Sequence, residues 1–296
     1  MTDKTYCIVM LEFLPLKIKN AIAHLNLQYL YEIRLRAGQP TMINYQGKYQ
    51  YLSALGVTAH KGKGVKCTMQ DITDCVYRAG KYSVYSVEDQ IKQGFLSAED
   101  GVRIGLAGEY VFEKGQPLAL RNFSSLCIRI PHEVRGCAQE IYTICMSDKV
   151  KNLLIASSPG IGKTTILRDL GRILSLNTAK NILICDERGE LAFGEFGETC
   201  DVVKYADKDT AFLAGIRAMR PDVIITDEIG ERDCFALEKA VIAGVKVIAA
   251  AHLSNFADLL PKYKEIFDYI VILNEEKIGE VKEIYRKTEG VLERIC

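Results

Sequence analysis

A short apolar run followed by a glycine-rich loop and a helical pattern constrains the fold of this 296-residue chain more than any other segment. The run is Leu153–Ala156, the loop reads SSPGIGKTT, and ILRDL opens a segment with helical spacing. A strand, loop and helix in this order is the context of a phosphate-binding loop, where backbone N–H groups and the helix N-terminus surround an anion. The residues predicted to bind ATP are Ser157, Ser158, Pro159, Gly160, Ile161, Gly162, Lys163, Thr164 and Thr165.

Side chains of this loop have distinct expected roles. Lys163 is expected to reach the β- and γ-phosphates, and the Thr164 hydroxyl is expected to ligate Mg²⁺. The usual pattern begins with glycine, whereas this chain has Ser157; the rest of the pattern is intact. ATP and Mg²⁺ are therefore the predicted cofactors.

Five further apolar runs follow in the same half of the chain, and helical segments separate most of them. They read NILICD, DVVKY, DVIITD, VKVIAAAH and DYIVIL. Continuous apolar strands that alternate with helices are typical of a parallel sheet covered on both faces. We therefore predict a doubly wound, mainly parallel α/β domain over residues 149–296. A connecting helix in PHEVRGCAQEIYTICMSDK precedes the boundary near Asp148.

The first 148 residues mix short helices with strands and carry no catalytic signature of their own. Helices are predicted for LPLKIKNAIAHLN, for DITDCVYRAG, opened by Thr68 or Asp71 and stopped by Gly80, and for SVYSVEDQIKQGF, ending at Gly94. Strands are predicted for EIRLR, the two halves of TMINYQGKYQYL, GVRIGLAGEYVFEKGQPLAL and SLCIRI. This half is expected to be a smaller α+β domain.

A second motif, RPDVIITDEIG, puts two carboxylates at the end of a buried strand. Val223–Thr226 delivers Asp227 and Glu228 to the carboxyl end, where ligands bind in open α/β sheets. Asp227 is the expected partner of Mg²⁺, directly or through water, and Glu228 suits a general base that orients an attacking water. The alternative, a charged strand end facing solvent, is disfavoured by the phosphate-binding loop in the same domain.

Two other strand ends carry candidate side chains. Asp186, Glu187 and Arg188 follow one run. All three are counted among the residues expected to bind ATP. The two carboxylates are candidates to support the metal or its waters, and Arg188 is a candidate to touch phosphate; the alternative is a solvated strand-to-loop transition. His252 ends the run after the Asp-Glu strand, where a side chain can sense the γ-phosphate; the alternative is a structural histidine.

Composition excludes several classes of protein. The 38 basic residues balance 38 acidic ones, whereas a protein that sheathes duplex DNA is usually basic. No apolar run reaches the about 18 residues of a membrane span, and the N-terminal apolar segment, with Glu12 and Pro15, lacks the features of a signal peptide. The ten cysteines form no CxxC pair, so we expect reduced thiols in a cytoplasmic protein.

The motifs taken in order resemble those of a known class of enzymes. SSPGIGKTT, CDERGE, RPDVIITDEIG and AAHLS are similar to the phosphate loop, acidic box, Asp-Glu strand end and histidine box of RecA-like secretion ATPases. This resemblance implies a RecA-like P-loop domain. It puts Lys163 and Thr164 on nucleotide and metal, Asp227 on metal, Glu228 as the catalytic base and His252 in the histidine box.

The segments of the first half resemble a narrower family. EIRLRAGQP, SVYSVEDQIKQGF, GVRIGLAGE and IRIPHEVRG are similar to the stage III sporulation protein AA family of endospore-forming bacteria, so that the resemblance extends over residues 32–254. It implies an ATPase of the mother cell, a homo-hexamer peripheral to the inner face of the membrane. Its implied partners are membrane-embedded proteins of a sporulation channel.

A ring of subunits suggests that an arginine enters the site of a neighbour. Such a residue supplies positive charge for the γ-phosphate beyond that of lysine and metal. Arg217 and Arg220, just before the Asp-Glu strand, are candidates, with a plain surface helix end as the alternative. The other candidates are Arg188, Arg103 and Arg129.

Two rival functions use the same core. A nucleic-acid-dependent ATPase needs a basic groove with stacking aromatics. Here the C-terminal half is net acidic, tryptophan is absent, and the short basic cluster Lys61, Lys63 and Lys66 reads as a solvated loop. A non-hydrolysing nucleotide-binding scaffold has no need of Glu228, and a guanine-specific GTPase is disfavoured because the sequence has no NKxD-type segment. We therefore expect an ATP-hydrolysing motor without a nucleic-acid partner.

Overall fold

The chain divides into two compact units, Met1–His132 and Glu133–Cys296. The computed structural model describes residues 11–81, 84–98, 101–253 and 255–296. The division precedes the expected boundary at Asp148, because helix α5 (Gln139–Met146), predicted as a connection, belongs to the second unit. Ile141, Cys145 and Met146 of α5 are buried in the core of that unit.

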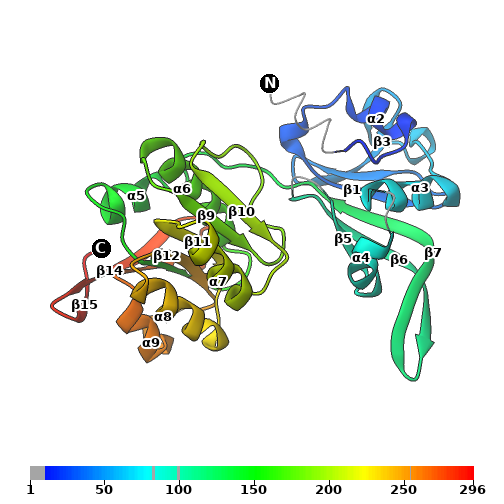
Figure 1. Ribbon diagram of the computed structural model, residues 1–296. Coiled ribbons are helices and arrows are strands. Elements are labelled where there is room, and N and C mark those ends of the chain that lie inside the picture. Colours follow the sequence, from blue (N-terminus) through cyan, green and yellow to red (C-terminus); the bar gives the residue numbers. More distant parts are fainter. Residues whose placement is uncertain (1–10, 82–83, 99–100, 254) are drawn as a thin grey trace. The chain divides into compact units, whose positions relative to one another are not determined.

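The first unit is an antiparallel sheet packed with helices around one apolar core (Figure 1). Within the described residues its seven strands run in the order β4-β3-β2-β1-β7-β6-β5. The strands are β1 (Leu30–Arg36), β2 (Met42–Tyr45), β3 (Lys48–Ser53), β4 (Gly56–Thr58), β5 (Phe95–Ser97), β6 (Arg103–Glu113) and β7 (Gln116–Arg129). The helices are α2 (Leu16–Ile22), α3 (Met69–Ala79) and α4 (Val84–Lys92).

Local signals explain most of these elements. Thr68 and Asp71 act together at the start of α3, because Thr68 caps the helix and the Asp71 carboxylate accepts the Thr68 N–H in return. Gln46 and Gly47 both have positive φ and form the turn between β2 and β3. Helix α2 is shorter than predicted, and the side chain of Asn26 then starts a separate 3₁₀ turn.

Some predictions fall partly outside the described residues. Ser83, at the start of the predicted helix SVYSVEDQIKQGF, is one such position, as is the apolar stretch up to Met10. Nine cysteines are described and are free thiols, whereas Cys7 lies outside the described residues.

The second unit is the predicted doubly wound α/β domain (Figure 1). Over the part of the chain that the structure describes, its eight strands run in the order β10-β9-β11-β12-β8-β13-β14-β15. All six predicted runs form strands, and they are parallel: β8 (Leu153–Ala156), β9 (Ile182–Asp186), β10 (Cys200–Lys204), β11 (Val223–Glu228), β12 (Lys246–Ala251) and β13 (Tyr269–Leu273). The antiparallel strands β14 (Val281–Thr288) and β15 (Val291–Arg294) extend one edge.

Two apolar cores cover the two faces of this sheet. One core joins it to α5 and to α6 (Lys163–Asn177). The other joins it to α7 (Lys208–Ala218), α8 (Cys234–Ile242) and α9 (Pro261–Ile266). Among the described residues no helix has both the length and the apolar character needed to cross a membrane.

The order of the parallel strands brings the candidate motifs together. Strand β12, which ends before His252, lies between β8, which ends at the glycine-rich loop, and β11, which ends at Glu228. Since the carboxyl ends of parallel strands meet at one edge of the sheet, three motifs far apart in the sequence share that edge.

Candidate functional site

The glycine-rich loop connects β8 to α6 with two glycines in the left-handed region. Gly160 has φ +82° and Gly162 has φ +100°, which side chains rarely tolerate. Gly162 precedes α6, so the helix N-terminus opens toward the loop. Ser157, which replaces the first glycine of the usual pattern, is fully buried and its hydroxyl donates to the Ser158 carbonyl at 3.0 Å. Serine is therefore accommodated by a local hydrogen bond.

The Lys163 ammonium is held by the loop and by a histidine. Its Nζ donates to the carbonyl oxygens of Ser157 and Ser158, both at 2.8 Å, and lies 2.9 Å from Nδ1 of His252. Burial lowers the pKa of Lys163, and the negative charges of Glu228 and Glu275 oppose that shift. Because an ammonium only donates, Nδ1 of His252 accepts this bond.

His252 links the lysine to a carboxylate. Its Nε2 lies 3.0 Å from Oε2 of Glu228, so the neutral ring carries its proton on Nε2 and donates to Glu228. Oε2 of Glu228 also lies 2.9 Å from a guanidinium nitrogen of Arg188. Lys163, His252, Glu228 and Arg188 thus form a continuous polar chain. Each of these side chains also lines one cavity.

Asp227, the neighbour of Glu228, is a buried carboxylate to which the described residues offer no well-aligned hydrogen bond. Neither of its oxygens has a hydrogen-bond partner among the described residues, although Oδ1 lies 3.2 Å from Nζ of Lys208. Burial raises the pKa of Asp227, and Lys208 pulls it down. A buried carboxylate with unsatisfied oxygens suits a cation ligand, and Thr164 lines the same cavity. Asp227 and Thr164 therefore fit a Mg²⁺ ion.

The cavity itself is large enough for a nucleotide phosphate chain. Its volume is about 380 Å³, within the usual range of small-molecule pockets. It is lined by Pro159, Gly160, Gly162, Lys163, Thr164, Thr165, Arg188, Glu190, Asp227, Glu228, Ala250 and His252.

Of the three residues at the acidic strand end, Asp186 shapes the following loop and Arg188 lines the cavity. The buried Asp186 carboxylate accepts the backbone N–H groups of Glu190, Leu191 and Ala192 at 3.0, 3.0 and 2.8 Å, so its oxygens shape the following loop. Glu187 pairs with Lys208 at 2.7 Å. Unlike Arg188, neither carboxylate lines the cavity. The Asp186 oxygens are thus engaged by the backbone, and support of the metal or its waters by Asp186 and Glu187 stays a prediction.

The candidate arginines lie elsewhere. Helix α7 begins at Lys208, beside Asp227, so Arg217 in its last turn and Arg220 beyond it lie at the far end of the helix. Both are exposed and neither lines the cavity of its own chain. In the first unit, Arg103 of β6 and Arg129 of β7 are directly paired across the two strands.

Two features that contribute to the site were not predicted from the sequence motifs. One is Lys208. The other is the turn between β13 and β14, where Glu275 accepts the Ser158 N–H at 2.9 Å and the Gly279 N–H donates to the Ile161 carbonyl at 3.0 Å. This turn braces the glycine-rich loop. A charged hairpin turn gives no sequence signal for such a contact.

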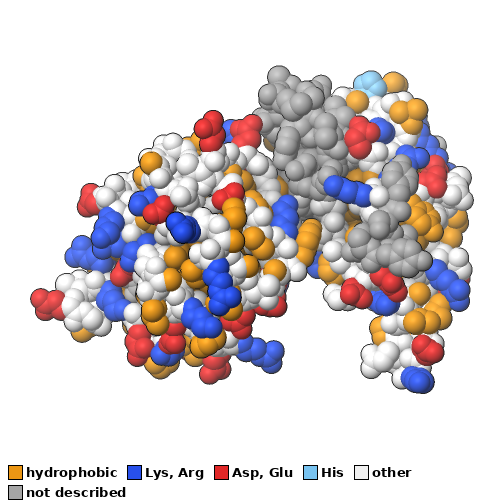
Figure 2. Space-filling view, in the orientation of Figure 1, with side chains coloured by type: hydrophobic (Ala, Val, Ile, Leu, Met, Phe, Trp, Pro, Cys, Tyr) orange, Lys and Arg blue, Asp and Glu red, His pale blue; other side chains and the backbone are white. Residues whose placement is uncertain are grey.

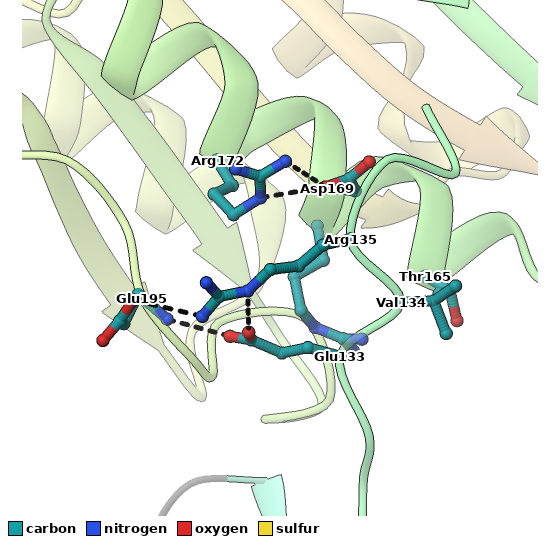
Figure 3. A pocket seen from close by; sticks show the side chains of 8 residues that line it. Glu133, Val134, Arg135, Thr165, Asp169, Arg172 and Glu195 are labelled. Atoms are coloured by element: carbon teal, nitrogen blue, oxygen red, sulfur yellow. Dashed lines mark hydrogen bonds and ion pairs between the residues drawn. The ribbon is translucent and has the colours of Figure 1, made fainter. Parts of the chain in front are cut away.

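The chain that enters the second unit is fastened beside the same helix, α6 (Figure 3). Glu133 accepts the Glu195 N–H at 2.9 Å, and Arg135 binds the carboxylates of both residues, at 3.0 and 3.1 Å. A little further on, the Ala138 N–H donates to Asp169 of α6 at 2.9 Å. These contacts anchor residues 133–138 to α6 and to the loop before β10.

Gly194→Ala is expected to destabilise the protein by weakening this anchor. Gly194 has φ +89°, and an added Cβ would lie 1.5 Å from Oε1 of Glu133, forcing that carboxylate away from Glu195. Gly244→Ala is the control, because Gly244 has φ +82° with no neighbouring atom within 4 Å. Urea unfolding should show a loss for Gly194→Ala that exceeds the control by roughly 1 kcal/mol. Equal losses would mean that the anchor adds nothing.

The chain is similar to known proteins over nearly its whole length. Residues 7–292 match the family described as sporulation stage III, protein AA. Stage III sporulation protein AA of Bacillus subtilis is 34% identical over an alignment 307 residues long, which covers 96% of this chain and 96% of that protein. The uncharacterized protein ycf45 of Porphyra purpurea is 25% identical over an alignment 300 residues long, which covers 96% of this chain and 47% of that protein.

Solved structures share the fold. The ATPase DotB of Legionella pneumophila matches with a TM-score of 0.57 and 12% identity, covering 92% of this chain and 80% of that chain. The ATPase DotB of Yersinia pseudotuberculosis matches with a TM-score of 0.53 and 12% identity, covering 88% and 76%. The predicted fold class, a RecA-like α/β sheet preceded by a smaller α+β domain, is confirmed.

Proposed function

This chain belongs to the sporulation stage III, protein AA family, and from that premise we propose that it is the ATP-hydrolysing motor of a secretion-like assembly required for sporulation. One arrangement carries the proposal: a phosphate-binding loop whose lysine is joined through His252 to Glu228, beside the buried carboxylate of Asp227. An anion site, a cation site and a base then meet in one cavity.

Each side chain has a proposed role in hydrolysis. Lys163 leaves the loop carbonyls for the β- and γ-phosphates, because a charged acceptor forms the stronger hydrogen bond. Glu228 orients the attacking water and takes its proton. His252 contacts both residues, so withdrawal of Lys163 frees Nδ1 and changes the surroundings of the base. Through the imidazole, the binding of phosphate by Lys163 thus alters the surroundings of Glu228.

The metal is proposed to be held by the two residues that suit it. Mg²⁺, when bound, supplies positive charge to the phosphate oxygens. Thr164 would contribute its hydroxyl, and Asp227 the carboxylate oxygens that no group within the described part of the chain hydrogen-bonds. Arg188 holds Glu228 at 2.9 Å and stands within the same cavity, where it can also meet phosphate.

The assembly is proposed to be a homo-hexamer in the mother-cell cytoplasm, peripheral to the inner face of the membrane and acting on membrane-embedded proteins of a sporulation channel. Family membership and the resemblance of the motifs to secretion ATPases support this part. The formal net charge is zero, and basic and acidic side chains are interspersed on the face shown in Figure 2. Both observations favour protein partners over nucleic acid.

Lys163→Ala tests the nucleotide site. The variant is expected to bind ATP about 10- to 150-fold more weakly while keeping its fold, because the charge-assisted contact with phosphate contributes about 1.5–3 kcal/mol. Titration calorimetry with ATP measures the loss, and circular dichroism checks the fold. Lys180→Ala is the control, since Lys180 pairs with Asp222 on the surface and lies outside the cavity. Equal ATP affinity for Lys163→Ala and the parent would refute the loop assignment.

A further inference from the structure

A buried lysine, Lys208, lies against the site and has no part in the chemistry proposed above. Its side chain is 6% exposed, and its Nζ lies 2.7 Å from Oε2 of Glu187 and 3.2 Å from Oδ1 of Asp227. The lysine belongs to α7, whereas the two carboxylates follow β9 and end β11. Helix α7 therefore places a cation next to Asp227, the carboxylate proposed to bind the metal.

This position is unfavourable for a lysine in two respects. Lysine is among the residues least often buried, because removing an ammonium group from water costs several kcal/mol. Lys208 is also the first residue of α7, where the partial positive charge of the helix N-terminus repels a cation. The adjacent cap residue Asp207 accepts the Thr210 N–H instead of binding the lysine. The carboxylates of Glu187 and Asp227 are therefore what hold the ammonium there.

We propose that Lys208 is a resident counter-cation that neutralises Asp227 while the site holds no metal and yields this carboxylate when Mg²⁺ arrives with the nucleotide. This inference rests on the proposed function, since it requires Asp227 to be the carboxylate that meets Mg²⁺. Two cations drawn to one buried carboxylate repel each other. When Asp227 turns to the metal, the Lys208 ammonium keeps its 2.7 Å ion pair with Glu187, because that contact does not involve Asp227.

The arrangement has a consequence for metal binding. Lys208 stabilises the metal-free protein and, by the same interaction, weakens the affinity of Asp227 for Mg²⁺. The metal alone is then a poor ligand, and nucleotide phosphates are needed to bring it into the site. Lys208 is in this sense a positioning residue that sets the metal requirement, and it touches neither substrate nor reacting atoms.

Thermal unfolding of the full chain, measured with ADP in EDTA and with ADP over a series of Mg²⁺ concentrations, tests the proposal without using activity. Lys208→Met removes the charge at similar length. It should lower the ligand-free midpoint on the order of 10 °C. It should also lower, by about 10-fold, the Mg²⁺ concentration that gives half of the Mg²⁺-dependent shift.

Three further variants separate the charge from mere packing. Lys208→Arg should keep both parental values. Lys208→Met combined with Asp227→Asn should recover the ligand-free midpoint, because no buried charge is left unpaired. The same double variant should lose the Mg²⁺ response, because the carboxylate proposed to bind the metal is gone. Lys180→Met, which breaks an exposed pair with Asp222, should change neither. If Lys208→Met does not fold, Lys208→Gln carries the same two expectations.

The outcomes distinguish this inference from the proposed function. A parent that responds to Mg²⁺ together with a Lys208→Met chain of unchanged or weaker Mg²⁺ response would overturn the role of Lys208 alone. A parent that ADP stabilises equally in EDTA and in Mg²⁺ would overturn the metal site, and with it both proposals.

Discussion

Glu228→Gln is expected to lower the rate of ATP hydrolysis by about 10²–10⁴-fold, the usual contribution of a positioned general base. The amide keeps the shape of the side chain and can still accept from Arg188 or His252, so the cavity stays intact. It cannot take the proton of the attacking water. Nucleotide and Mg²⁺ binding should therefore persist, and a phosphate-release assay beside titration calorimetry measures the two properties separately.

Two comparisons sharpen this expectation. Asp227→Asn should weaken Mg²⁺-dependent nucleotide binding, because it removes the charge of the buried carboxylate proposed to hold the metal. Glu231→Gln, an exposed position in the 3₁₀ turn Glu231–Asp233 just beyond the site, should hydrolyse ATP at the parental rate. Normal turnover by Glu228→Gln would remove the general-base assignment.

Hydrolysis per chain is expected to rise with protein concentration until the proposed ring forms, because in that ring an arginine from a neighbour would complete the site. An arginine supplied in this way contributes about 10³–10⁵ in rate in other phosphoryl-transfer enzymes. Alanine at the responsible position among Arg103, Arg129, Arg188, Arg217 and Arg220 should cause a loss of that size. Rates over a dilution series, with the oligomeric state measured by light scattering, test this expectation.

Mixing two inactive chains gives the decisive control. A Glu228→Gln chain keeps its arginine, and an arginine-deficient chain keeps its Glu228, so one of the mixed interfaces has both parts and turnover should partly return. Arg217 and Arg220 lie at the far end of α7 from Asp227, so a loss caused by either points to action in a neighbour. Constant activity per chain down to a demonstrated monomer would refute the dependence on assembly.

The sequence predicts the central parallel strands of the second unit better than the strands at the edge of its sheet. Five of the six parallel strands, β8, β9, β11, β12 and β13, are nearly continuous apolar runs because helices cover both faces of the sheet, and each was predictable from that pattern. The sixth, β10, lies at the sheet edge with its residues exposed or half-buried, and its short apolar run was still enough to predict it. The hairpin of β14 and β15 was not predicted. Strand β14 has one fully buried residue, Ile284, among alternating charged and partly exposed ones, so its sequence gives little apolar signal. Strand β14 forms by pairing with its neighbour β13, and the local hydrophobic pattern of a sequence does not reveal such a pairing.

The candidate site shows a similar limit. Patterns place Lys163, Asp227, Glu228 and His252 at strand ends, and strand order brings them to one edge of the sheet. Patterns do not tell where a carboxylate points. Asp186 stands at an equivalent strand end, yet its oxygens are occupied by three backbone N–H groups. Lys208, charged and at a helix start, resembles any surface lysine in the sequence and is buried only because two carboxylates surround it.

The fastening of residues 133–138 has a mechanical consequence. Asp169, which holds Ala138, lies on α6, whose first residue is the phosphate-seeking Lys163. Glu133 and Arg135 hold the loop before β10, and Ala138 holds α6, so a load on residues 133–138 would reach the helix that begins at Lys163 before it reaches β8. On the function proposed above, bound phosphate and the segment that enters the second unit would therefore act on one and the same helix.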